Sequence, residues 1–183
     1  DRCDLADATS LRRMVRALAP ELILNAAAYT AVDRAESEPA LAHSINAVAP
    51  GVLGEEARTL GALVVHYSTD YVFDGSQSRP YVEDDPTNPQ SMYGRSKLAG
   101  EEALRASGAA HFIFRTSWVF GPHRQNFLLT MLRLAAERDS LKVVNDQVGA
   151  PTPADWIAES TVEVLTRHNR GEVLPAALGT YHL

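Results

Sequence analysis

Three short apolar runs, each followed by a polar or aromatic cluster, constrain the fold of this chain most strongly. The runs are residues 21–24, 62–68 and 111–114, and stretches with the helical spacing of Leu11, Met14, Val15 and Leu18 alternate with them. Short apolar runs of this kind are typical of buried parallel strands. Alternation of strand and helix predicts the α/β class, with a doubly wound parallel sheet in a three-layer α/β/α arrangement.

The clusters that follow these runs predict where a ligand binds. They cover residues 25–30 (NAAAYT), residues 68–75 (STDYVFDG) and residues 115–121 (RTSWVFG). In doubly wound sheets, ligands bind at the carboxyl ends of the strands. All three clusters fall at such ends, which indicates one site rather than three unrelated surface patches.

Tyr93 and Lys97 form the second strong signal. Only two of the 17 basic residues are lysine, and one of them follows a tyrosine by four positions. On a helix, residues four apart share a face. A cation beside a phenol stabilises the phenolate, so we expect Lys97 to lower the Tyr93 pKa and make a proton donor or acceptor. From this pair alone, a surface tyrosine beside a lysine stem is an equally good interpretation.

Five ordered segments now resemble one family. They are residues 26–36 (AAAYTAVDRAE), 68–75, 93–101 (YGRSKLAGE), 115–121 and 145–152 (NDQVGAPT). Together they resemble the dTDP-4-dehydrorhamnose reductases of the extended short-chain dehydrogenase/reductase superfamily. The resemblance covers essentially the whole chain and implies a Rossmann-like fold.

The resemblance implies a reduction of the C4 ketone of dTDP-4-dehydro-β-L-rhamnose, for bacterial cell-surface polysaccharide synthesis. No side chain donates hydride, so NADPH or NADH is implied as the cofactor. Tyr93 would give the proton, Lys97 would hold the nicotinamide ribose, and Thr69 would hydrogen-bond the carbonyl oxygen where charge develops.

The resemblance also assigns binding residues. The cofactor side would be formed by Asp4, Leu5, Ala28, Tyr29, Thr30 and Tyr67, together with Tyr93 and Lys97. The substrate side would be formed by Thr69, Asp70, Tyr71 and Trp118.

The chain departs from the family at both ends. It begins at Asp1 without the family's first strand and glycine-rich loop, and residues 181–183 resemble an interior strand that is cut short. We therefore expect an internal part of a longer reductase, inactive by itself. Residues 1–150 would form a partial cofactor-binding domain, and residues 151–183 would continue the sheet and begin an interleaved substrate lobe.

Composition narrows the alternatives. A formal net charge of −6 argues against nucleic acid as a partner, and no apolar run is long enough to span a membrane. We expect a cytoplasmic enzyme with a dTDP-sugar as its partner, and the resemblance leaves open a homodimer.

Five scattered histidines lack metal-ligand spacing and are expected to be packed or at the surface: His43, His66, His111, His123 and His168. We expect no metal site, although some relatives bind Mg²⁺ at a subunit interface that Asp155 could approach.

Two alternatives stay open. A nucleotide-sugar epimerase or dehydratase of the same superfamily also carries a threonine and the Tyr93–Lys97 spacing, and Asp70 could serve its chemistry. The regulatory subunit of methionine adenosyltransferase resembles this family as well and works as a binding partner without catalysis.

Overall fold

The computed structural model describes residues 3–123 and 126–183 of the chain. They form two compact units, the first made of residues 3–115 and 176–182, the second of residues 116–175 and 183. The boundary that we predict at residue 150 lies inside the second unit. The chain leaves the first unit at residue 116 and returns to it at residue 176.

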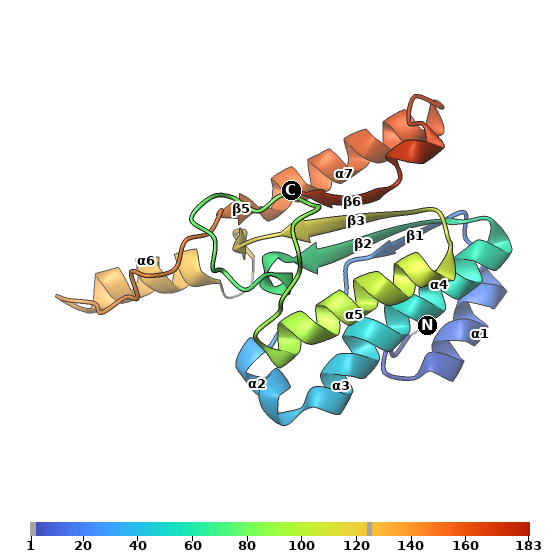
Figure 1. Cartoon of the computed structure of the whole chain (residues 1–183). Helices are drawn as coiled ribbons and strands as arrows, with labels where there is room; N and C mark the ends of the chain where they lie inside the picture. Colours follow the sequence, from blue (N-terminus) through green and yellow to red (C-terminus); the bar gives the residue numbers. More distant parts are fainter. Residues whose placement is uncertain (1–2, 124–125) are drawn as a thin grey trace. The chain divides into compact units, whose positions relative to one another are not determined.

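The first unit is built on a four-stranded sheet in the order β1-β2-β3-β6 (Figure 1). Its strands are β1 (Leu22–Asn25), β2 (Leu63–Thr69), β3 (His111–Thr116) and β6 (Gly179–His182). β1 pairs in parallel with β2, and β3 pairs in parallel with β6. The predicted α/β class with a parallel sheet is therefore confirmed.

The first unit also contains helices that precede or connect these strands. They are α1 (Ala8–Leu18), α2 (Val32–Ser37), α3 (Pro39–His43), α4 (Ala49–Leu60) and α5 (Met92–Ser107), with a π-helical segment, Ser44–Val48, that leads from α3 into α4. α4 and α5 contact β2, and α1 lies beside α4. The core between α4, α5 and the sheet is apolar, with Ala57, Val64, Leu104 and Ile113 all buried. A second cluster joins α1 to α4 through Leu11, Val15 and Leu53.

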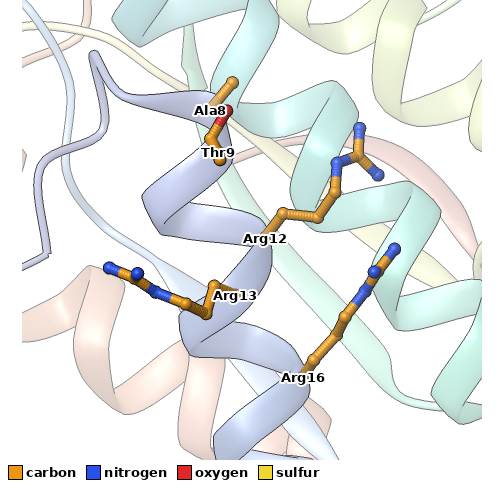
Figure 2. Close-up of a pocket in the computed structure, with 5 residues that line it drawn as sticks. All are labelled: Ala8, Thr9, Arg12, Arg13 and Arg16. Carbon is orange, nitrogen blue, oxygen red and sulfur yellow. The ribbon is translucent and has the colours of Figure 1, made fainter.

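A pair of arginines ties α1 to α4 at the surface of this core. Arg12 and Arg16 both bind Glu56, at 2.8 and 2.7 Å, and the Glu56 side chain is only 3% exposed. Figure 2 shows that the two guanidinium groups extend to the same side of α1, while Arg13 points the other way. These arginines help to line a hollow of about 540 Å³ over α1. Because Glu55 and Glu56 already engage two of its three arginines, we interpret the hollow as part of a structural clamp.

A long loop between β2 and α5 is held by its own side chains. The Asp74 carboxylate accepts hydrogen bonds from the Ser76 amide, the Tyr81 hydroxyl and the Asn88 amide. Hydrogen bonds with the side chain and the amide of Ser76, followed by those with Asn88 and Tyr81, hold the pKa of Asp74 well below its ordinary range. The Tyr81 ring stacks on Phe73 with centroids 4.3 Å apart. The loop between β2 and α5 is therefore held together by contacts among its own side chains, although it contains Pro80, Pro86 and Pro89.

The second unit contains β4 (Val119–Phe120), β5 (Thr152–Pro153), α6 (Phe127–Glu137) and α7 (Ala154–Asn169). β4 and β5 form a short parallel pair. Asn126 caps α6 by accepting from the Leu129 amide. Within the described ranges, no helix in either unit is long and apolar enough to cross a membrane.

Candidate active site

The carboxyl end of β2 and the first turns of α5 bring three predicted catalytic residues together. Thr69 is the last residue of β2, and Tyr93 and Lys97 lie one turn apart on α5. Thr69 and Lys97 are buried, while Tyr93 is half-buried. The helical face predicted for the tyrosine and the lysine is confirmed.

Local sequence explains why α5 begins here and approaches β2. Ser91 caps the helix by accepting from the Gly94 amide at 3.0 Å. A Cβ at position 94 would lie 2.3 Å from the Tyr71 carbonyl oxygen, so only glycine allows this approach. The close approach places the Tyr93 ring edge-on to Tyr71, with centroids 5.5 Å apart.

Thr69 connects the strand end to its neighbours. Its hydroxyl donates to Asp70 Oδ1 at 3.1 Å and accepts from the Tyr71 amide at 3.2 Å. It also forms a hydrogen bond with the Tyr93 side chain. The hydroxyl pair is thus close enough to share one substrate oxygen, which is the arrangement that an acid and an oxyanion donor require.

The pKa of Tyr93 differs from the sequence expectation. Burial raises the pKa of Tyr93 above its ordinary value, the hydrogen bond with Thr69 lowers it in part, and the charge of Asp70 raises it further. In the chain itself the prediction of a lowered Tyr93 pKa is therefore wrong, because burial outweighs stabilisation of the phenolate. A protonated Tyr93 is the form that can act as an acid.

Lys97 is a buried cation with few partners. It is 2% exposed, and burial lowers its pKa to about 8, against the attraction of Glu101 one turn further along α5. Its Nζ donates to the Tyr67 carbonyl at 2.7 Å and lies 3.2 Å from His66 Nε2. Lys97 therefore remains largely charged at neutral pH while sitting in an apolar environment.

A buried ion pair supports α5 behind the lysine. Arg115 forms two hydrogen bonds with the fully buried Glu101, at 2.9 and 2.7 Å. Burial alone would raise the pKa of Glu101, but Arg115 outweighs it and the net pKa is lowered. The pair fixes α5 against β3.

The strip after β1 is small and accessible, as a cofactor-binding strip must be. Ala26 and Ala27 are exposed, and Ala28 and Tyr29 are half-buried. Asn46, in the π-helical segment, accepts from the Tyr29 amide and donates to the Tyr29 carbonyl and to Ser96 on α5. The Tyr29 hydroxyl donates to Glu38, and this bond raises the Tyr29 pKa. Asn46 therefore holds the strip beside the helix that carries Tyr93 and Lys97.

The remaining residues that the resemblance assigns to the cofactor lie in different parts of the first unit. Thr30 is exposed, Tyr67 is half-buried near Phe114, and Asp4 is exposed with its carboxylate on the Ala6 amide. Leu5 packs against the cluster between α1 and α4, which supports a packing role for it.

Trp118 belongs to the second unit. Its side chain is 41% exposed and its ring lies 6.0 Å from that of Phe127. Its φ of 45° lies in the left-handed region, which is uncommon for a tryptophan. Such backbone strain clusters at functional sites, and the ligand role of Trp118 stays a prediction.

Sequence reasoning missed several polar residues of this site. His66, Asn25 and Asn46 are buried beside the catalytic elements. His66 is packed, as the sequence analysis allows, but its contact with Lys97 was not predicted; a polar residue inside an apolar run is the signal that could have pointed to it. Among the described residues, no group of three or more His, Cys, Asp or Glu could hold a metal ion, so Mg²⁺ gains no support.

Comparisons with known proteins show the family to which the chain belongs. The family model described as the RmlD substrate binding domain matches residues 1–183. The dTDP-4-dehydrorhamnose reductase of Burkholderia thailandensis is 50% identical over 184 residues, covering 100% of this chain and 62% of that protein.

Two solved structures extend the comparison to the fold. The structure of a dTDP-4-dehydrorhamnose reductase from Clostridium acetobutylicum has a TM-score of 0.89 at 39% identity, covering 98% of this chain and 61% of that one. A Bacillus anthracis dTDP-4-dehydrorhamnose reductase in complex with NADP has a TM-score of 0.86 at 37% identity, with the same coverage. The chain thus spans about three fifths of the length of these relatives.

Proposed function

Because this chain belongs to the family of the RmlD substrate binding domain, we propose that the protein which carries it is an NAD(P)H-dependent dTDP-4-dehydrorhamnose reductase. It would reduce the C4 ketone of dTDP-4-dehydro-β-L-rhamnose to give dTDP-β-L-rhamnose. The observation that carries the proposal is the hydrogen-bonded pair Tyr93 and Thr69 beside the buried Lys97. A role in cell-surface polysaccharide synthesis and a cytoplasmic location follow from the resemblance alone.

The residues present fit a nicotinamide cofactor. Among the described residues, Lys97 Nζ has two hydrogen-bonding neighbours, and an ammonium carries three N–H donors, so one donor remains for a ribose hydroxyl. The exposed Ala26 and Ala27 leave the backbone after β1 open to a flat ligand. When bound, NADPH or NADH would supply the hydride.

The chain's own residues would supply the proton that the reduced C4 oxygen takes up. Tyr93, kept protonated by its raised pKa, would donate its phenol proton to the alkoxide oxygen that forms at C4. Thr69 would donate a hydrogen bond to the same oxygen as charge develops. The positive charge of Lys97 would favour the phenolate left behind.

The binding roles assigned by resemblance stay proposals. Asp4, Leu5, Ala28, Tyr29, Thr30 and Tyr67 are proposed for the cofactor, and Asp70, Tyr71 and Trp118 for the nucleotide-sugar. Tyr71 is 44% exposed beside Tyr93, so its ring is accessible to a ligand. A homodimer is also a proposal, which light scattering on the full-length protein would test.

A superfamily epimerase or dehydratase is the second candidate function. The observation in its favour is the Asp70 carboxylate, 3.1 Å from the Thr69 hydroxyl, where an acid or base for C5 chemistry could act.

One experiment separates these functions. The full-length protein is incubated with dTDP-4-dehydro-β-L-rhamnose and NADPH that carries deuterium at the transferred position. A reductase gives dTDP-rhamnose with one deuterium at C4 and consumes one NADPH for each product molecule. Isomerisation at C5 without NADPH consumption would show an epimerase instead, and no conversion at all would contradict both enzymatic functions.

A further inference from the structure

A buried histidine lies directly behind the catalytic lysine. His66, in β2, is 1% exposed, and both nitrogens of its ring face polar groups from neighbouring elements. Nε2 lies 3.2 Å from Lys97 Nζ on α5, and Nδ1 lies 3.0 Å from the side-chain amide of Asn25 at the end of β1. A chain of three buried polar side chains therefore runs from β1 through β2 to α5.

The chemistry of the ammonium fixes the hydrogen bonds of this chain. A charged lysine has donors only, so Nε2 must accept from Lys97. A neutral imidazole then carries its one proton on Nδ1, and this N–H needs an acceptor. The Asn25 amide supplies one when its oxygen faces the ring, since the oxygen and nitrogen of an amide exchange places by a simple flip.

We propose that His66 is a positioning residue for the reaction: its Nε2 holds the Lys97 ammonium in place, and Asn25 fixes the imidazole tautomer that makes this possible. This inference rests on the proposed function and adds residues to that same site. His66 touches neither the substrate nor the reacting atoms, and it acts through Lys97.

The surroundings favour this role over simple packing. His66 follows three buried apolar residues of β2, so an apolar side chain would suit its position equally well. Burial, followed by the charge of Lys97, holds the pKa of His66 well below its ordinary value, so the ring stays neutral and able to accept. The groups that act on Lys97 are the ring of His66 and the Tyr67 carbonyl from β2, and the Glu101 charge from α5.

The two contacts take two of the three ammonium donors and leave the third for the cofactor. A hydrogen bond in a buried environment is stronger than one in water, because the dielectric is low. Loss of the Nε2 contact should therefore allow the Lys97 side chain to move away from its position and should also lower the pKa of Lys97.

Two similar substitutions separate the functions of the two ring nitrogens. His66→Gln places an amide near the position of Nε2 and keeps an acceptor for Lys97. His66→Asn places its amide near the position of Nδ1, so it keeps a partner for Asn25 and loses the contact with Lys97. His111→Asn is the matched control, because His111 lies on β3 with its ring on the Ala109 carbonyl.

The first measurement is kcat of the full-length reductase with NADPH and the 4-keto sugar. We expect His66→Asn to lower kcat about 10-fold to 100-fold, because small misplacements of catalytic groups have effects of that order. His66→Gln should recover most of that loss, and His111→Asn should leave kcat unchanged.

The second measurement needs no turnover. With lysine labelled with ¹³C at Cε, NMR follows the titration of Lys97. The Lys97 signal is assigned as the one that is missing from the spectrum of Lys97→Arg. In His66→Asn the midpoint should move down by about one pH unit, the equivalent of one net hydrogen bond, and in His66→Gln it should stay. In the wild-type protein, ¹⁵N NMR of the His66 ring should show the proton on Nδ1.

Several results would overturn the inference. These are a proton on Nε2 at pH 7, equal losses in His66→Gln and His66→Asn, or a Lys97 titration that His66→Asn leaves unmoved. The ring and lysine titrations do not depend on the substrate. A wild-type protein that fails to reduce the 4-keto sugar would therefore contradict the proposed function, while these two titrations would still decide the role of His66.

Discussion

At the scale of single residues, the site depends on a balance between burial and charge. Lys97 keeps its charge in a buried environment, where the Glu101 charge offsets part of the desolvation and His66 and the Tyr67 carbonyl lie within hydrogen-bonding distance of Nζ. Tyr93 responds in the opposite way, since burial favours its neutral form. Burial therefore leaves Lys97 as a cation with a lowered pKa and Tyr93 as a neutral acid with a raised pKa, and the proposed reduction uses both groups in these forms.

The lowered pKa of Lys97 predicts a pH dependence of stability. Between about pH 8 and the ordinary lysine pKa near 10.5, the unfolded chain holds a proton that the folded chain has released. Stability contributed by this position therefore rises with pH across that window and is constant below it. Urea unfolding of the wild-type protein and Lys97→Met should diverge by up to about 3 kcal/mol in favour of the wild type between these limits.

The second lysine provides the control for this prediction. Lys142 is exposed, so Lys142→Met should follow the wild type at every pH. A difference between the wild type and Lys97→Met that stays flat from pH 8 to 10.5 would show that Lys97 has an ordinary pKa.

Trp118 gives a second prediction at this scale. If its ring contacts the nucleotide-sugar, Trp118→Ala should weaken substrate affinity by about tenfold or more and leave NADPH affinity unchanged, since an aromatic anchor contributes chiefly to the ligand that it covers. Calorimetric titration with each ligand measures both affinities. Because the side chain is 41% exposed, the change in melting temperature should be small.

Trp156, which is 47% exposed on α7, is the matched control for this test. Trp156→Ala should leave both affinities unchanged. A Trp118→Ala protein with a large drop in melting temperature and normal substrate affinity would assign Trp118 to packing.

At the scale of elements, the position of α5 depends on two close approaches of the backbone. Gly94 meets the Tyr71 carbonyl, and Gly100 meets the Asn46 carbonyl of the π-helical segment, where a Cβ would lie only 2.0 Å from the oxygen. A π-helical segment is a distortion of an α-helix, and such segments are frequent at functional sites. Here the distortion orients Asn46 toward Tyr29 and Ser96.

This geometry predicts a reversal of helix propensity. Replacement of a helical glycine by alanine ordinarily stabilises a helix by about 1 kcal/mol. Gly100→Ala should instead destabilise the protein by about 1–3 kcal/mol, because the added methyl group meets a carbonyl oxygen that the packed backbone cannot move freely. Gly51→Ala, whose Cβ would lie 3.1 Å from that of Ala103, should be milder. Denaturant midpoints measure both, and a stabilised Gly100→Ala would refute the close approach.

The clamp between α1 and α4 predicts how the fold responds to acid. Hydrogen bonds from Arg16 and Arg12 hold the pKa of Glu56 at about 2, against the effect of burial. Because this pKa is lower in the folded state than in the unfolded state, the contribution is complete above about pH 4.5 and is lost as pH falls toward 2. Glu56→Gln should therefore be less stable than the wild type at pH 7, and the two should converge in acid.

Thermal melts at pH 7, 4 and 2.5 would show this convergence. Glu163→Gln removes an exposed ion pair with Arg167 and should have little effect at any pH. If Glu56→Gln were as stable as the wild type at pH 7, the clamp would contribute nothing to the fold.

The elements themselves were largely predictable from the sequence, and their side-chain partners were not. The runs at residues 21–24, 62–68 and 111–114 form strands with bounds shifted by one or two residues. The first run is a strand but is not buried as expected, since Leu22 and Leu24 are 41% and 51% exposed on β1 at the edge of the sheet. The Tyr93–Lys97 face followed from helical periodicity. The His66–Lys97 contact joins residues 31 positions apart and depends on how α5 lies against β2. No local pattern contains that information.

At the scale of the whole molecule, the chain forms two compact units, and the first is built from two segments that are separated along the sequence by the second. Residues 116–175 form the second unit before β6 returns to the first. The boundary at residue 150 between a cofactor-binding domain and a substrate lobe stays a prediction. Tyr93, Lys97 and Thr69 all lie in the first unit, so the chemical part of the proposed site does not depend on the second.

The turnover of Tyr93→Phe tests the central claim most directly. The full-length wild-type protein, Tyr93→Phe and the control Tyr181→Phe are compared for NADPH oxidation by dTDP-4-dehydro-β-L-rhamnose, with melts and NADPH titrations to show that each is folded and binds cofactor. Tyr181 suits the control because its hydroxyl donates to the Ala177 carbonyl at the edge of the sheet. The account predicts that kcat falls by about 10²–10⁴-fold in Tyr93→Phe alone, since the acid is removed. A loss of less than tenfold would contradict Tyr93 as the proton donor and, with it, the proposed mechanism.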